Sequence, residues 1–405
     1  MSNTKFKFNA VYDRYGTAGC DAAAELCSMF RRECADWLAS LWDGNVGAFY
    51  YATSSRVTDG YLPDSESTIQ ALGLLRLLGM FTDEHDISDK MKRKMGEFAY
   101  SIQDPDGYFY HPQWKEMMLR EPKRFSSRRG RDFGQCLGLL RRAGMKPKYP
   151  TALDNLAKAR EGGEVSEAAT LPEHLRSREA FIKYLDELDI NTNSYPKGHE
   201  LSSQAAQIKA AGLAEVCVEY MASKQNKENG TWENQVDIHS INGVTKIGTA
   251  FTSLGARIPN ADVAFRSAIS VALVTDRGPA ITATYNPFWT MNQMLGGFRS
   301  SGLTEDYNTA RSMLFEHGTA LIAATATKLR HYFHEPESAF HYCHNGSSAT
   351  SQNAPASLGV LEGDVNATSL GIDTVCRVFD MLELPVGKPC DTSDGLRFLE
   401  MIGEL

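Results

Sequence analysis

Two histidines that precede short helical stretches are the first candidates for chemistry in this chain. Imidazole titrates near neutrality, so it can accept or donate a proton under ordinary conditions. We expect His239, with Asp237 and His199 nearby, to carry acid–base function. Tyr285 is the expected complementary acid. The competing interpretation of Asp237 and His239 is that they cap a helix or lie on its rim.

Asp64 and Glu66 form a second candidate pair, two residues apart and directly before another helical stretch. Carboxylates are favoured at helix N-termini, so both residues are expected to cap that helix. Their alternative role is that of paired carboxylates in a hydrolase. This second role becomes the preferred one if His239 lies away from the site.

Aromatic, amide and guanidinium groups in the same segments are the candidates for binding a substrate. Aromatic rings stack on sugar faces and polar groups bond hydroxyls, which suits a carbohydrate. A basic segment in a chain of net charge −8 is typical either of a solvated face or of a site for a carboxylate or phosphate. The binding candidates are Arg128, Arg129, Arg131, Asn286, Trp289, Trp114 and Tyr61.

A short phrase recurs along the chain and indicates the elements that must position these groups. It consists of an acidic or amide residue, a glycine, and an aromatic residue two positions later. A degenerate copy has Ser338 in place of the glycine. Internal repetition of this kind indicates stacked repeats. The copies span residues 43–49, 103–109, 225–232 and 334–340.

Two families of helices alternate around these phrases. The first is short, rich in Ala, Gly and Leu, and mostly ends at a glycine, which suits the left-handed C′ position. The second is longer and amphipathic, with one buried and one wet face. The first family covers 67–80, 131–145, 203–212, 244–255, 287–302 and 364–382. The second covers 20–42, 91–102, 178–188, 213–224, 263–274 and 307–332.

Six helices of each kind predict an all-α (α/α)6 barrel, with an inner and an outer ring built from six hairpins. A hairpin cannot bury its face alone, so we expect one domain over residues 1–405. The inner helices would converge, and the segments that lead into them would line one mouth of a central cavity. The candidate residues would therefore meet although they are far apart in sequence.

The phrase Gln103-x-x-x-Gly107-x-Phe109 resembles the QW repeat of squalene and terpenoid cyclases. Similar aromatic–glycine turns occur in protein prenyltransferase β-subunits on the same α/α toroid. The resemblance implies the toroid fold far more strongly than an activity. The chemical motifs of these families, a D-x-D-D acid and an Asp-x-Cys zinc pair with a distant histidine, are missing. No metal and no cofactor are therefore expected.

The composition indicates which classes of partner and which cellular compartment to expect. The net charge of −8 argues against nucleic-acid binding. No stretch of eighteen apolar residues is present, so no membrane partner is expected. The eight cysteines include no CxxC pair, and we interpret them as reduced residues of a cytoplasmic protein.

These observations favour a carbohydrate-active enzyme, a lyase or a hydrolase, that acts on a uronate-containing or otherwise acidic oligosaccharide. In a lyase, His or Tyr would abstract the C5 proton and Tyr would protonate the leaving oxygen. One alternative is an enzyme like the isoprenoid cyclases or prenyltransferases, in which the arginines hold diphosphate. Another is a non-catalytic toroid that binds a glycan or peptide. The sequence leaves the sugar and the oligomeric state open.

Overall fold

The chain folds mainly into α-helices joined by short turns. A computed structural model describes residues 6–161, 170–385 and 387–405. Within these ranges there are nineteen α-helices, and the strands form three two-stranded antiparallel ribbons. The all-α class expected from the sequence is confirmed.

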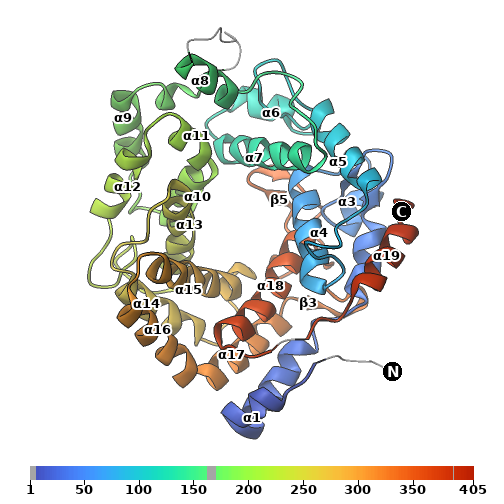
Figure 1. Cartoon of the computed structure of the whole chain (residues 1–405), viewed down its shortest axis with the longest axis vertical. Helices are drawn as coiled ribbons and strands as arrows, with labels where there is room; N and C mark the ends of the chain where they lie inside the picture. The colour runs from blue at the N-terminus through green and yellow to red at the C-terminus, as the bar shows by residue number, and fades with distance from the viewer. Residues whose placement is uncertain (1–5, 162–169, 386) are drawn as a thin grey trace.

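Six helices surround the middle of the molecule (Figure 1). Each packs against the next in chain order, and the last packs against the first, so the contacts close a circle. These inner helices are α4 (Ser65–Leu78), α7 (Ser126–Arg142), α10 (Ser194–Ser203), α13 (Ile238–Leu254), α15 (Thr282–Ser300) and α18 (Val365–Met381).

Glycines set the closest approach between two inner helices, α10 and α13. A Cβ atom at Gly243 would lie 1.8 Å from Ser194 Oγ, and one at Gly198 would lie 2.6 Å from Ile247 Cγ1. A side chain at either position would overlap residues of the facing helix, so glycine permits this close approach. The helix α10 also lies earlier than the sequence pattern indicates, since that pattern places the third inner helix over 203–212.

A second set of helices lies outside the first (Figure 1). Among them, α2 packs on α4, α5 on α7, α12 on α13, and α14 on α15, while α17 contacts α18 and α1 runs along α17. The outer helices are α1 (Asn9–Cys27), α2 (Cys34–Ser40), α5 (Asp89–Ser101), α9 (Arg178–Leu188), α12 (Ala214–Ser223), α14 (Ala261–Ala272), α16 (Thr304–Glu316) and α17 (Gly318–Arg330).

Short elements complete the chain. The remaining helices are α3 (Thr53–Val57), α6 (Lys115–Arg120), α8 (Ala152–Arg160), α11 (Ala205–Ala210) and α19 (Thr392–Met401), with 3-10 turns at Glu173–Leu175 and Glu335–Glu337. The strands are β1 (Trp42–Asp43), β2 (Ala48–Phe49), β3 (Phe333–His334), β4 (Ala339–Phe340), β5 (Thr350–Ser351) and β6 (Ala354–Pro355).

Two of the outer helices expected from the sequence are each divided. The segment 20–42 belongs to α1 and α2, and the residues between the two helices include the buried Met29 and Phe30. The segment 307–332 is divided into α16 and α17 at Gly318. A Cβ atom there would lie 2.2 Å from the Tyr15 hydroxyl of α1.

The repeated phrases lie on turns, as the sequence indicates. Gly47, Gly107 and Gly230 have φ angles of 81°, 84° and 72°, and Ser338 takes the same left-handed conformation at 50°. The following aromatic residues Phe49, Phe109, Trp232 and Phe340 are all fully buried. Each phrase thus reverses the chain with a left-handed residue and anchors the turn with a buried ring.

The phrases that begin near the two ends of the chain share one register. Strands β1 and β2 pair Trp42 with Phe49, and strands β3 and β4 pair Phe333 with Phe340. In the first, Thr68 Oγ1 accepts from Phe49 N, and in the second, Thr368 Oγ1 accepts from Phe340 N, both at 2.9 Å. The first and last hairpins are therefore copies of one local structure.

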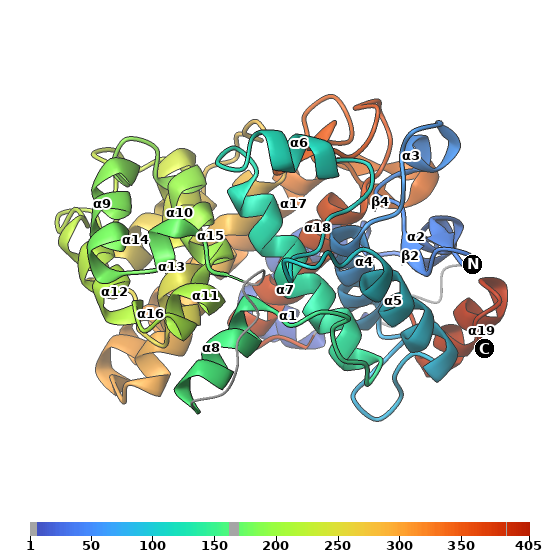
Figure 2. The same ribbon diagram turned by 90° about the horizontal axis from the view of Figure 1, so that it is seen from above.

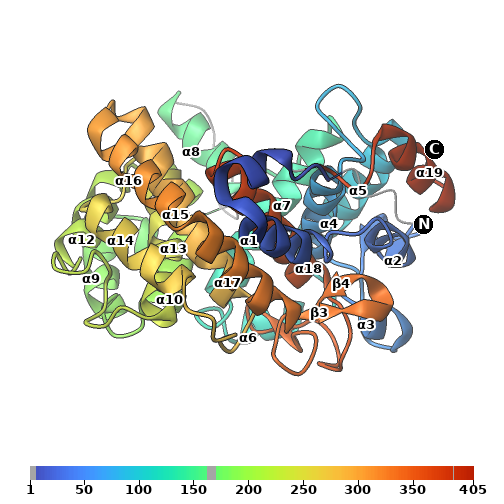
Figure 3. The same cartoon turned by 90° about the horizontal axis from the view of Figure 1, so that it is seen from below.

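One edge of the ring carries most of the irregular segments. Figures 2 and 3 show α3, α6 and the segment between β4 and α18 along this edge, whereas α8 and α19 lie towards the other. The N-terminus of α4 is on the α3 side, because Asp64 pairs with Phe49 just ahead of α3. Among the described helices, none combines the length and apolar run that a bilayer crossing needs.

Candidate functional site

A buried ionic cluster joins the N-terminal ends of α4 and α7. The guanidinium of Arg128 is 1% exposed. It donates to both oxygens of Asp132, at 2.7 and 3.1 Å, and from Nη1 to Glu66 Oε2 at 2.8 Å. Burial alone would lower the pKa of Arg128, but the carboxylates of Asp132, Glu66 and Asp64 outweigh it and raise that pKa. Arg128 therefore serves the fold, since all three of its nitrogens are engaged.

Trp114 lies behind this cluster. Its indole Nε1 donates to Asp132 Oδ2 at 3.3 Å, and the Arg128 guanidinium lies 4.7 Å above its ring. The His111 ring stacks on Trp114 at a centroid distance of 3.8 Å, and burial lowers the pKa of His111. Trp114 is 2% exposed, so it packs in the wall of the ring.

Asp64 and Glu66 both belong to the cluster but have different hydrogen-bond partners. Asp64 caps α4, accepting from the backbone N–H groups of Glu66 and Ser67 at 2.8 and 3.0 Å. The Glu66 carboxylate accepts from Arg128, from Arg131 and, at 3.2 Å, from Ser351 Oγ of β5. The capping role expected for Asp64 is the one that the structure shows. Glu66 instead links the cluster to Arg131 and to the β5 segment.

His199 and Lys246 continue the site from α10 and α13, next to Arg131. Burial lowers the pKa of His199 well below its ordinary value, and the positive charges of Lys246 and Arg131 lower it further. His199 is therefore a neutral imidazole at pH 7. Its Nε2 atom is buried without a hydrogen-bond partner among the described residues.

Lys246 is surrounded by charged and aromatic groups from three other helices. Burial lowers its pKa, and Arg131 adds to this effect, whereas Tyr195 and Glu66 oppose it. The ammonium group lies 5.6 Å from the centroid of the Tyr195 ring. Lys246 thus connects the basic part of the site to a group of tyrosines.

Tyr195 and Tyr342 form that group with Asp364. Burial raises the pKa of Tyr342 well above its ordinary value, and its interaction with the Tyr195 hydroxyl raises it further. Asp364 is fully buried and caps α18, accepting from Ala367 N and Tyr342 N, both at 2.8 Å. Burial raises the pKa of its carboxyl from 3.8 to about 7 although backbone N–H groups and the Tyr51 hydroxyl oppose the shift.

Tyr285 and Trp289 lie elsewhere on the inner wall, one turn apart on α15. Their rings stack at 5.7 Å. The Arg377 guanidinium of α18 covers Trp289 at 4.5 Å and donates to Asp373 at 2.5 Å. Burial raises the pKa of Tyr285 well above its ordinary value, and Asp373 adds to this. The structure brings Tyr285 together with α18 and shows no contact with His239 or His199 in the described residues.

His239 is exposed in the first turn of α13, and the described residues offer its ring no polar partner. Asp237 caps the same helix, its Oδ1 accepting from Ser240 N at 2.9 Å. The capping alternative for Asp237 is thus shown. By helical spacing, His239 lies on the same face of α13 as Lys246.

The remaining binding candidates are separated from one another. Arg129 stacks on Tyr108 at 5.1 Å. Tyr61 donates from its hydroxyl to Ser357 O at 3.0 Å, which holds the segment between β6 and α18. Asn286 is buried and donates from Nδ2 to Asn242 Oδ1 at 2.7 Å. Of the basic segment, only Arg131 lies next to His199 and Lys246.

Several groups of the site were not chosen from the sequence. Lys246 and Asp364 lie within expected inner helices or at their start, and Tyr342 lies two residues after a repeated phrase. Helical spacing gives a usable signal, because His239, Asn242, Lys246 and Thr249 form one polar stripe on α13. A polar stripe on a helix that is otherwise buried indicates a face toward other polar groups.

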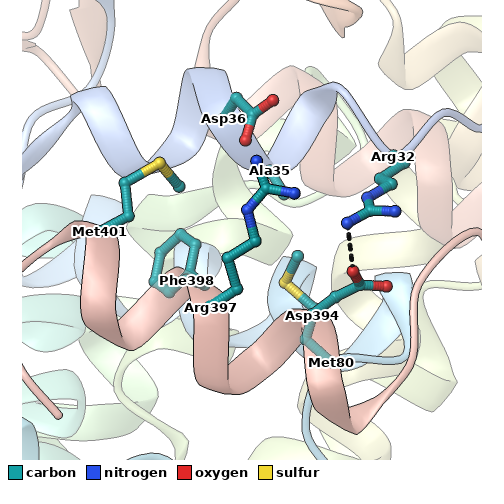
Figure 4. Close-up of a pocket in the computed structure, with 8 residues that line it drawn as sticks. All are labelled: Arg32, Ala35, Asp36, Met80, Asp394, Arg397, Phe398 and Met401. Carbon is teal, nitrogen blue, oxygen red and sulfur yellow. Dashed lines mark ion pairs between the residues drawn. The ribbon is translucent and has the colours of Figure 1, made fainter.

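A small cavity lies outside the circle, between α2 and α19 (Figure 4). Its volume of about 10 Å³ has room for roughly one water molecule. Arg32 and Asp394, which both line the cavity, form an ion pair at 2.5 Å. It is a packing gap between these two helices. In the ranges that the structure describes, no group of three or more His, Cys, Asp or Glu side chains is arranged to hold a metal ion.

Comparison of the chain with protein-family models, with curated proteins and with solved structures found no match.

Proposed function

We propose that the chain is a carbohydrate-active enzyme that moves protons on an acidic oligosaccharide, and that it folds as one six-hairpin α/α toroid over residues 1–405. The circle of inner-helix contacts and the four repeated turns support the toroid. In such a ring, residues from separate hairpins face one another. One cluster draws its residues from separate hairpins in this way. It consists of His199, Lys246, Tyr195 and Tyr342.

The observation that carries the proposal is a pair of groups, connected through Tyr195, whose pKa values are moved in opposite directions. Burial lowers the pKa of the His199 imidazole and raises the pKa of the Tyr342 hydroxyl. At pH 7 the first holds no charge and can accept a proton, while the second holds its proton. Tyr195 links them, since it lies one turn before His199 on α10 and interacts with Tyr342.

These groups fit β-elimination at a uronate residue. His199 takes the proton at C5, and the electrons of that bond form the C4–C5 double bond. The bond from C4 to the glycosidic oxygen breaks as the double bond forms, and that oxygen receives the proton of Tyr342 or Tyr195. Electrons and protons balance without a metal or cofactor, and no cofactor is part of the proposal.

The cluster favours His199 over His239 as the base. His239 is exposed and has no polar partner in the described part of the chain, whereas His199 is held among charged groups. The isoprenoid alternative is supported less well, because Arg128 is occupied by three buried carboxylates. A reducing compartment is part of the proposal, since all eight cysteines are free.

The test is an assay of the purified protein on oligosaccharides from pectate, alginate and glycosaminoglycans. A lyase produces the ultraviolet absorbance of a conjugated uronate. We expect His199→Asn to lower kcat by about 10²–10⁴-fold, as is typical for loss of a general base. His331→Asn, on the exposed end of α17, is the matched control and should retain full activity.

Three outcomes would change the proposal. Release of reducing sugar without the absorbance would make the enzyme a hydrolase and return Glu66 to consideration. Full activity in His199→Asn together with loss in His239→Ala would move the base to His239. Binding without turnover on every oligosaccharide would support a non-catalytic toroid.

A further inference from the structure

Two buried nitrogens of the site have no hydrogen-bond partner among the described residues. Arg131 Nε and His199 Nε2 are buried and unpartnered. Lys246 is partly exposed, and within the described ranges its ammonium group makes no hydrogen bond or ion pair but lies 5.6 Å from the centroid of the Tyr195 ring. A buried polar atom without a partner is unfavourable, so two of them beside an ammonium group indicate a ligand that satisfies them.

The charges around these donors point to the sign of that ligand. Arg131 and Lys246 each lower the pKa of His199, and Arg131 lowers the pKa of Lys246. The two cations therefore repel each other across a neutral imidazole. An anion placed between them would relieve this repulsion and accept from their free N–H groups.

The neighbouring acids limit how much negative charge fits. Asp64, Glu66 and Asp132 surround Arg128, and Glu66 also takes one end of Arg131. Three carboxylates thus already face the two arginines. Lys246 senses the charge of Glu66 but forms no ion pair within the described residues, which suits a ligand with a single negative charge.

We propose that Arg131 Nε and Lys246 Nζ, beside His199, form a seat for one carboxylate group, that of a uronic acid. The carboxylate part of this inference comes from the unpartnered donors, and the sugar part rests on the proposed function. A carboxylate seated between Arg131 and Lys246 would keep the carbon that bears it, and the proton on that carbon, beside His199. The seat would therefore orient the substrate toward the base as well as bind it.

Titration calorimetry at pH 7 tests the seat without any assay of turnover. The probes are glucuronate and galacturonate, their neutral counterparts glucose and galactose, and inorganic phosphate. We expect the uronates to bind and Lys246→Met to weaken them at least tenfold, which corresponds to about 1.4 kcal/mol. Lys227→Met, on an exposed turn, is the matched control and should bind as the unaltered protein does.

Arg131→Lys serves as the second variant, because it keeps the positive charge beside Glu66 but removes the Nε donor. It should weaken uronate binding while circular dichroism shows an intact fold. Equal affinity for glucose and glucuronate would overturn the seat and leave a neutral sugar site. Preference for inorganic phosphate, or no uronate binding, would also overturn it. Uronate binding without turnover of any oligosaccharide would uphold the seat and refute the proposed reaction.

Discussion

Burial decides the protonation of single side chains in this protein. Asp364 has no cationic partner among its recorded contacts and is fully buried, so the pKa of its carboxyl rises to about 7. Glu66 lies between Arg128 and Arg131 and is compensated directly. Two carboxylates at the starts of neighbouring inner helices thus differ in whether a cationic side chain compensates their charge. The difference can be measured as a dependence of stability on pH.

We predict that the Asp364 carboxyl stabilises the fold less as pH rises. Its pKa is 3.8 when unfolded and about 7 when folded, so between these values the folded state holds the extra proton. This contribution is complete below about pH 4 and is lost as pH passes 7. Its upper bound is on the order of 4 kcal/mol, at about 1.4 kcal/mol for each pKa unit.

Urea unfolding of the unaltered protein and of Asp364→Asn at several pH values gives the measurement. The difference in their free energies of unfolding should fall between pH 4 and 7, because the amide does not titrate. A difference that stays flat over this range would show that Asp364 has an ordinary pKa. Tyr51 and Tyr342 face Asp364 but have raised pKa values, so they do not titrate in this window.

At the scale of elements, the turns are held by close backbone contact. A Cβ atom at Gly230 would lie 2.3 Å from Ala264 N of the outer helix α14. Gly255 ends α13 with a similar positive φ of 86°, but open space surrounds it. A substitution at Gly255 would therefore test conformational strain alone. The same substitution at Gly230 would test strain together with steric overlap.

We predict that Gly255→Ala destabilises the fold by about 1 kcal/mol, the usual cost of a left-handed alanine. Gly230→Ala should cost a further ~1–3 kcal/mol, because the turn must move away from α14. Chemical denaturation of both variants provides the comparison. Equal losses would show that the turn does not lie against α14.

Lys328 is a second test at this scale. It is 1% exposed in α17 and donates to Ala272 O at the end of α14, at 2.8 Å. Burial lowers its pKa from 10.5 to about 8. Between these values the unfolded state holds more protons, so the stability of the fold should rise with pH there. Lys328→Met should abolish this rise, up to about 3 kcal/mol, and a rise that survives would assign it to other groups.

The sequence made the turns and helix types predictable because their causes are local. A left-handed residue followed by a buried aromatic can be recognised within ten residues, as at Gly107 and Phe109. The breaks near Met29 and at Gly318 depend on contacts with distant helices, so local periodicity did not reveal them. The association of Glu66, Arg131, His199 and Lys246 depends on four helices meeting in space. Residue types alone suggested only some of its members.

At the scale of the whole molecule, the closed circle of inner helices governs cooperativity. An open array of repeats frays from its ends, because each repeat contacts only its neighbours. Here α18 packs on α4, so the first and last hairpins are neighbours as well. We predict one calorimetric transition, with equal calorimetric and van't Hoff enthalpies. Two separate transitions would indicate independently folding parts and contradict a single domain.

The contacts that close the circle also bring the early and late parts of the chain together. Arg32 pairs with Asp394, and Arg14 donates to Leu382 O. The first and last turns carry the same Phe–Thr hydrogen bond. The contacts between neighbouring hairpins therefore do not depend on the hairpin at which the chain begins. A circularly permuted protein, with its present ends joined by a short linker and new ends opened in another turn, would have the same neighbours at every hairpin and should reach the same fold.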